Sequence, residues 1–228
     1  MELLHDPEFG ERLITLMAAF ALVFQIAMVA QKSLLTNIRV FGAQAALLGG
    51  IAAAIAWYNH APHIYIAAFL TLLVKGIFVP ILLTRLVERL EIRHEIEPVI
   101  NVPLSVVISG CLTLVAYVVG ESFYHPGSGA GAGNLGRNTL AVAISLFLIG
   151  FFMMITRRKA VSQVLALLSL ENGVFLAAIC LTYGMPLIVE MGVFFDVLVA
   201  VLVLGILVFR IRETFDSMDV SKMRRLRG

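Results

Sequence analysis

Four ionisable residues lie inside long apolar runs of the chain, where charged side chains are rarely found. Three of them, Glu171, Glu190 and Asp196, fall in the last two runs, and Lys75 falls in an earlier one. An ionisable side chain near the centre of a lipid bilayer costs about 2.5–3.5 kcal/mol on insertion scales. A sequence that accepts this cost repeatedly is expected to use the groups, and the chemistry open to carboxylates and an amine there is proton exchange.

The composition indicates that membrane helices position these residues. Of the 228 residues, 60% are hydrophobic and 14% are charged, whereas about a quarter of the residues of a soluble domain are charged. Several apolar runs reach the roughly 18–20 residues that cross a bilayer. We therefore expect an all-α, polytopic protein of the bacterial or archaeal cytoplasmic membrane, surrounded by lipid. The basic residues are scattered among short loops, so we expect no nucleic-acid partner.

Seven transmembrane helices are expected. They cover approximately residues 13–30, 38–58, 63–84, 102–119 and 139–155, and a final pair within 160–211 that a turn at 183–186 interrupts. Taken alternately, the segments between these spans place Arg12 and Arg137 on one side of the membrane and every other Lys and Arg except Lys75 on the opposite side. Because positive residues stay on the cytoplasmic side, the N-terminus is predicted outside and the C-terminus inside.

Three of the spans carry features that predict local structure. Pro80 follows Lys75 by about one turn, which predicts a kink in the third span. The second span has small residues at every fourth position, which predict a smooth face for a neighbouring helix: Gly42, Ala46, Gly50 and Ala54. The fourth span carries hydroxyls on one face, which either line a polar path or, as is commoner, bond to their own helix carbonyls: Ser105, Ser109 and Thr113.

No cofactor is expected in this chain. Cys111 and Cys180 lie in separate apolar runs, away from any His, and are interpreted as small hydrophobic core residues. A metal, haem or iron–sulfur site would need clustered ligands. The glycine-rich stretch at 127–133 is not followed by the Lys-Ser or Lys-Thr of a phosphate loop, so it is interpreted as a connector.

Depth in the membrane follows from the rise of about 1.5 Å per helical residue. Glu171 is about 18 Å from each end of its span, and Asp196 and Lys75 also lie near the midplane. Glu190 lies only about 6 Å below the outer end of its helix. One interpretation is an internal ion pair of Lys75 with Glu171 or Asp196. Three acids outnumber one base, however, and unpaired carboxylates linked by water would form a proton relay.

The last three spans resemble the K-type subunit of respiratory complex I and the C-type subunit of Mrp antiporters. The resemblance is carried by Arg157-Arg158, Leu168-Ser169-Leu170-Glu171-Asn172, Asp196 and the tail Met218-Asp219-Val220-Ser221-Lys222-Met223. With four preceding spans, the whole chain resembles component E of hydrogenase-4 and formate hydrogenlyase-type complexes. This division gives a four-helix extension with an outer glycine-rich loop at residues 1–136 and a three-helix module with a basic cytoplasmic tail at 137–228.

The resemblance implies a non-catalytic membrane-arm subunit of an energy-converting, ion-translocating complex. Its partners would be large antiporter-like subunits and other membrane-arm subunits, with a soluble redox arm acting indirectly. In the K-type subunit, two membrane acids on adjacent helices belong to the proton path. Glu171 matches the first, and Asp196 or Glu190 matches the second. The alternative function is a structural scaffold that packs antiporter-like subunits without conducting protons.

Overall fold

The computed structural model describes residues 7–58, 62–89, 100–122 and 134–182. Their regular elements are helices: α1 (Pro7–Ala30), α2 (Leu34–Tyr58), α3 (Pro62–Thr71), η2 (Leu72–Phe78), α4 (Val79–Arg89), α5 (Val102–Ser122), α6 (Asn134–Thr156) and α7 (Ala160–Thr182). Six helices in these ranges are long and apolar enough to cross a membrane, with α3, η2 and α4 contributing to a single one. The predicted all-α class is confirmed for the described residues.

Several features named above lie outside the described residues. They are the seventh span, Glu190, Asp196, the stretch at 127–133, the basic tail and the Cys180 side chain.

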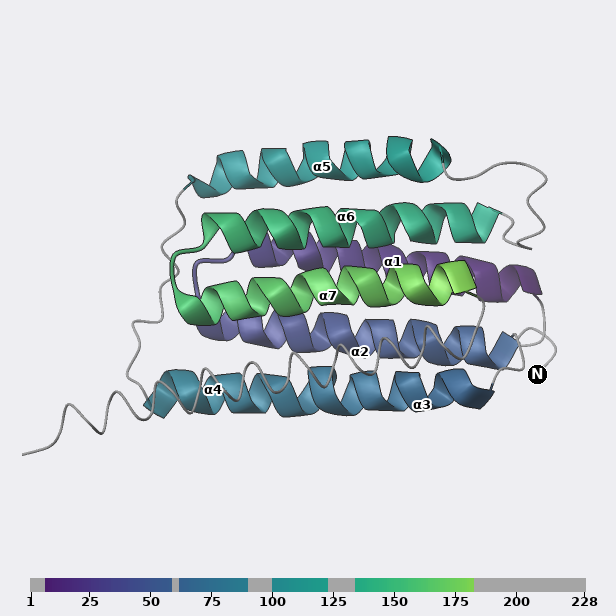
Figure 1. The fold of residues 1–228 in the computed structure, drawn as a ribbon, viewed down its shortest axis with the longest axis horizontal. Coiled ribbons are helices and arrows are strands. Elements are labelled where there is room, and N and C mark those ends of the chain that lie inside the picture. The colour runs from purple at the N-terminus through teal and green to yellow at the C-terminus, as the bar shows by residue number, and fades with distance from the viewer. Residues whose placement is uncertain (1–6, 59–61, 90–99, 123–133, 183–228) are drawn as a thin grey trace, which may run out of the picture.

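The helices run side by side as one bundle (Figure 1). Helix α5 lies at one edge and packs on α6, while α3, η2 and α4 form a continuous rod at the opposite edge, beside α2. Between these edges, α6 packs along α7 and α1 packs along α2. Contacts of α1 with α6 and of α2 with α7 join the N-terminal helices to the C-terminal ones.

The surface of the bundle is inverted relative to that of a soluble protein. Large apolar residues cover the outside of the bundle, for example Ile66 and Leu114, which are 68% and 69% exposed. In η2, Ile77 is 54% exposed whereas Lys75 is only 1% exposed. Lipid favours apolar side chains on the surface, and charged residues then face the bundle interior. This inversion is what a multi-pass membrane protein requires.

Glycines bring the helices of the C-terminal part into close contact. A Cβ atom at Gly150 of α6 would lie 2.6 Å from the backbone nitrogen of Leu170. A Cβ atom at Gly173 of α7 would lie 2.5 Å from the nitrogen of Phe147. Only glycine leaves room for backbones at this separation, as small residues do generally between membrane helices.

The prediction that small residues of α2 form one face for a neighbouring helix is correct at Gly42 and wrong at Gly50. Gly42 faces Pro80 and the Gly76 carbonyl of the neighbouring rod, where a Cβ atom would lie 3.0 and 3.2 Å from them. The face then continues through Gly49, which approaches the Ala68 carbonyl, whereas Gly50 meets Met17 of α1. A strict four-residue spacing drifts around a helix of 3.6 residues per turn, so positions 42 and 50 contact different neighbours.

The hydroxyls of α5 behave as the commoner alternative predicted. Ser109 and Thr113 donate to the carbonyls of Ser105 and Ser109 at 2.8 and 2.9 Å, and Ser105 donates to Asn101 at 3.2 Å. These bonds stay within one helix and form no path between helices. The interpretation of Cys111 as a core residue is wrong, because its side chain is exposed on α5.

Arg157, in the turn between α6 and α7, is buried and fastens the end of α1. Its Nη2 atom donates to the carbonyls of Met28 at 3.3 Å and Val29 at 2.9 Å. These are carbonyls of the last turn of α1, which lack partners within their own helix. Desolvation lowers the pKa of Arg157 from its ordinary value, but a guanidinium remains charged in proteins. Its neighbour Arg158 is exposed.

Candidate functional site

A π-helical segment carries Lys75 into the core. The N–H of Val79 bonds to the carbonyl of Val74, five residues back, and the helix continues without a break on both sides of η2. The cause is Pro80, which has no N–H for the carbonyl of Gly76 and whose ring would clash with that carbonyl in a regular α-helix. The wider turn relieves this conflict, so the irregularity predicted at Pro80 takes the form of a π-helix, a feature frequent at functional sites.

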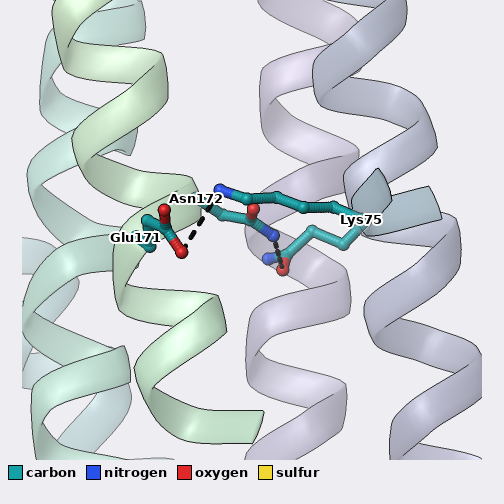
Figure 2. Close-up of polar contacts among 4 residues, drawn as sticks. Lys75, Glu171 and Asn172 are labelled. Carbon is teal, nitrogen blue, oxygen red and sulfur yellow. Dashed lines mark hydrogen bonds and ion pairs between the residues drawn. The ribbon is translucent and has the colours of Figure 1, made fainter. Parts of the chain in front are cut away.

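Lys75 reaches across the bundle to Glu171 of α7. Its Nζ lies 3.5 Å from Oε2 of Glu171, and the two side chains are 2% and 8% exposed. The lysine also lies over the ring of Phe175, with Nζ 5.8 Å from the ring centroid. Figure 2 shows the extended lysine pointing at the helix that carries Glu171 and Asn172. The predicted internal ion pair therefore forms between Lys75 and Glu171.

A hydrogen-bonded network of neutral side chains lies beside this pair. Asn172 donates through Nδ2 to Oε1 of Gln44 at 3.2 Å, and Gln44 donates through Nε2 to Oε1 of Gln25 at 2.8 Å (Figure 2 draws the contact of Asn172). The hydroxyl of Ser169 donates to the same oxygen of Gln25. The amide nitrogen of Gln25, Nε2, lies 3.6 Å from Sδ of Met153 in α6. The network therefore links α7, α2, α1 and α6.

The ion pair and the network together divide the hydrophobic core. One apolar cluster contains Ile14 and Ala21 of α1, and the other contains Met28. On four helices, polar residues fall between the two clusters. These residues, called the polar layer below, are Gln25 in α1, Gln44 in α2, Thr71 and Lys75 in the third helix, and Ser169, Glu171 and Asn172 in α7.

Sequence reasoning found the charged members of the polar layer and missed the neutral ones. Gln25 and Gln44 each interrupt an apolar run, as Lys75 does, and both side chains are fully buried. Ser169 and Asn172 are three residues apart, so they share a face of α7. The neutral members of the polar layer could therefore have been predicted from the sequence. They are amides and hydroxyls in the middle of apolar spans, at the same depth as the ionisable residues.

The arrangement is suited to moving protons. A carboxylate and an amine in contact inside a membrane protein are groups of the kind that form proton paths. Two buried oxygen atoms near the pair, Oγ1 of Thr71 and Oδ1 of Asn172, have no hydrogen-bond partner among the described residues. Buried polar atoms of this kind are commonly satisfied by water, and water beside a carboxylate can carry a proton to or from it.

Comparison with known proteins places the chain in a family. The family described as NADH-ubiquinone/plastoquinone oxidoreductase chain 4L matches residues 138–228. An uncharacterized protein of Mycobacterium tuberculosis, Rv0085, is 37% identical over 157 residues, which are 68% of this chain and 69% of that protein. Hydrogenase-4 component E of Escherichia coli K12 is 22% identical over 220 residues, covering 96% of this chain and 99% of the relative.

The same protein of Shigella flexneri matches equally well, and no solved structure gives a significant match. Glu171, Asn172 and Ser169 lie in the segment that matches chain 4L, whereas Lys75, Gln44 and Gln25 lie before it. The chain is thus a multi-pass cell-membrane protein of the same family as Rv0085; it resembles hydrogenase-4 component E over nearly its whole length, and its residues 138–228 match the chain 4L family.

Proposed function

We propose that this chain is a membrane-arm subunit of an energy-converting, hydrogenase-type and complex-I-like assembly, in which it relays protons. The observation that carries this proposal is the contact between Lys75 and Glu171 at 3.5 Å inside the polar layer. Ionisable groups held in a membrane interior are rare and mark ion pathways and proton relays. The relatives support the assembly, since hydrogenase-4 component E matches nearly the whole chain.

In the proposed relay, Glu171 takes up and releases protons, and Lys75 compensates its negative charge. The lysine shifts the free energy of the charged carboxylate, so small movements of Nζ change the proton affinity of Glu171. Asp196 would be the second acid and Glu190 the connection to the outer surface, because their positions in the sequence place Asp196 near the midplane of the membrane and Glu190 near its outer side. The chain itself would perform no redox chemistry.

The proposed surroundings follow from the same reasoning. Large antiporter-like subunits and other membrane-arm subunits would pack against the bundle, and a soluble redox arm would act at a distance. We further propose seven spans with the N-terminus outside and the C-terminus in the cytoplasm. Residues 1–136 would be an extension that supplies Lys75, and residues 137–228 would be the three-helix module that supplies Glu171.

The experiment that tests the relay compares Glu171→Gln and Asp196→Asn in the full complex. Each replacement keeps the size of the side chain and removes its titration. We expect redox-driven proton translocation per assembled complex in membrane vesicles to fall at least about tenfold, a conservative figure against the roughly 10²–10⁴-fold contribution of a positioned proton-transfer group, while electron transfer remains. Glu171→Gln leaves the charge of Lys75 buried without its partner, so its yield of complex is expected to fall as well. Normal translocation per assembled complex in both variants would rule out the relay.

The second candidate is a scaffold subunit, and one observation favours it. Helix α7, which carries Glu171, packs so closely on α6 that Gly150 and Gly173 have no room for a methyl group. In that case the ion pair and the amides would fix helix positions only. If the subunit is a scaffold, the complex should translocate protons normally after both charges of the pair are removed together. If the subunit is a relay, it should not.

A further inference from the structure

We propose that Gln44 is the positioning residue of the ion pair: acting through Asn172, it fixes the rotation of α7 on which the contact between Lys75 and Glu171 depends. The inference adds a residue to the proposed relay and rests on that function for its importance. It concerns a neutral side chain in α2, a helix that contributes no charge to the pair.

The amide of Gln44 has only one orientation that satisfies its neighbours. Nε2 donates to the backbone carbonyl of Ala21 at 3.0 Å and to Oε1 of Gln25 at 2.8 Å, while Oε1 accepts from Asn172. A flipped amide would set its oxygen against two acceptors and its nitrogen against a donor. An amide offers two donors and one acceptor oxygen, so both donors and the oxygen of Gln44 are used.

The anchor of Gln44 is rigid, because the Ala21 carbonyl belongs to the backbone of α1. The second acceptor, Oε1 of Gln25, also receives the hydroxyl of Ser169. Ser169 and Asn172 lie on one face of α7, three residues apart. Helix α7 is therefore tied to α1 and α2 at two neighbouring points on the same face, and such a pair of ties opposes rotation about the helix axis.

Rotation of α7 about its axis would displace the ion pair. Glu171 and Asn172 are consecutive, so their side chains leave the helix about 100° apart. One meets the third helix and the other meets α2, and neither can turn without the other. Side-chain ends lie about 5–6 Å from a helix axis, so a rotation of 10° moves the carboxylate by about 1 Å. That shift is large against a contact of 3.5 Å.

Gln44 is suited to this task because it does not titrate. Its hydrogen bonds remain the same whether Glu171 carries a proton or not, so the geometry of the pair persists through a cycle of proton uptake and release. A buried network whose members are hydrogen-bonded rigidifies its surroundings. The polar layer therefore contains a charged part that changes and a neutral part that holds it in place.

The test measures how fast dicyclohexylcarbodiimide modifies Glu171 in native membranes containing the full chain. This reagent attacks protonated carboxyl groups in apolar surroundings, and mass spectrometry of the peptide containing Glu171 gives the rate. In wild type, Nζ of Lys75 lies 3.5 Å from a carboxylate oxygen that the reagent must reach, so we expect the reaction to be slow. Lys75→Met gives the reference rate for a carboxyl group that has lost its lysine.

We expect Gln44→Met, which preserves the length of the side chain, to raise the modification rate at neutral pH about tenfold, toward the rate of Lys75→Met. A factor of this size corresponds to the loss of one interaction with a charged group. Asn172→Leu removes the same hydrogen bond from the α7 side and should give the same rise. The matched control is Asn37→Leu, a buried amide two turns earlier in α2 that belongs to no hydrogen bond of the polar layer.

Wild-type modification rates in both Gln44→Met and Asn172→Leu would overturn the proposal, as would an equal rise in Asn37→Leu. Modification requires only that the chain is inserted in the membrane, so a low yield of assembled complex does not hide the result. The outcome is also separate from the relay itself. If Glu171→Gln left proton translocation intact, the proposed function would fail while the modification rates still decided the role of Gln44.

Discussion

A complex that carries Lys75→Met alone is expected to lose most of its assembled subunit, and adding Glu171→Gln is expected to restore it. Removing one partner of a buried ion pair costs about 3–5 kcal/mol, because the other charge stays buried without compensation. Replacing both partners by neutral side chains of similar size removes the attraction and the desolvation penalty together. The two substitutions should therefore be strongly non-additive, as expected for residues in contact.

The deficit of Lys75→Met should depend on pH in a definite direction. The stranded glutamate can remain buried if it is protonated, and protonating an ordinary glutamate at pH 7 costs about 3.7 kcal/mol. This cost falls by about 1.4 kcal/mol for each unit by which the pH is lowered. Thermal dissociation of the detergent-solubilised complex should therefore show a larger defect at pH 8 than at pH 6. The double variant should show little pH dependence, and equal stability of single and double variants at both pH values would contradict the pairing.

A methyl group at Gly173 is expected to be the most damaging small change elsewhere in the bundle. In Gly173→Ala the new atom would lie 2.5 Å from the Phe147 nitrogen and 2.9 Å from the Ala143 carbonyl oxygen. Both are backbone atoms and cannot rotate away, so α6 and α7 must separate. Overpacking of this kind costs about 1–3 kcal/mol or more, and it displaces Glu171, two residues away in the same helix. We expect the yield of assembled complex on native gels to fall severalfold.

Gly110→Ala is the matched control for this prediction. A Cβ atom at Gly110, in α5, would meet nothing within 4 Å. Alanine is also the better helix former by about 0.5–1 kcal/mol, so this variant should assemble as well as wild type. A defect of equal size in both variants would mean that glycine matters here for reasons other than helix separation.

Much of the fold could be predicted because membrane helices are specified by simple physical rules. The length and apolarity of each run sufficed to place the spans around Lys75 and Glu171. Depth followed from the rise per residue, and Lys75 and Glu171, two of the three residues placed near the midplane, are in contact in the structure; the third, Asp196, lies outside the described residues. The preference of hydroxyls for their own helix carbonyls anticipated the bonds of Ser109 and Thr113.

The contacts between helices could not be predicted, because they depend on the azimuth of each helix, that is, its rotation about its own axis. The periodicity of the sequence constrains this rotation poorly when a helix is apolar on every side. Pro80 signalled an irregular helix but not a π-helix, and it is from this π-helical segment that Lys75 reaches Glu171 of α7. The division of Gly42 and Gly50 between two neighbours is another effect of azimuth. Gln25 and Gln44 could have been recognised as polar residues within apolar spans. Their hydrogen bonds could not have been predicted without knowing the relative rotation of three helices.

The most direct test of the relay is the number of protons translocated per electron by the complex that carries both Lys75→Met and Glu171→Gln. This variant removes the titrating pair while keeping the charge balance of the polar layer, so its assembly is expected to be close to normal. If Lys75 and Glu171 form the relay, vesicles containing this variant will transfer electrons from the complex's own donor and translocate markedly fewer protons than wild type. A normal proton count would contradict the relay and leave the scaffold as the function of this subunit.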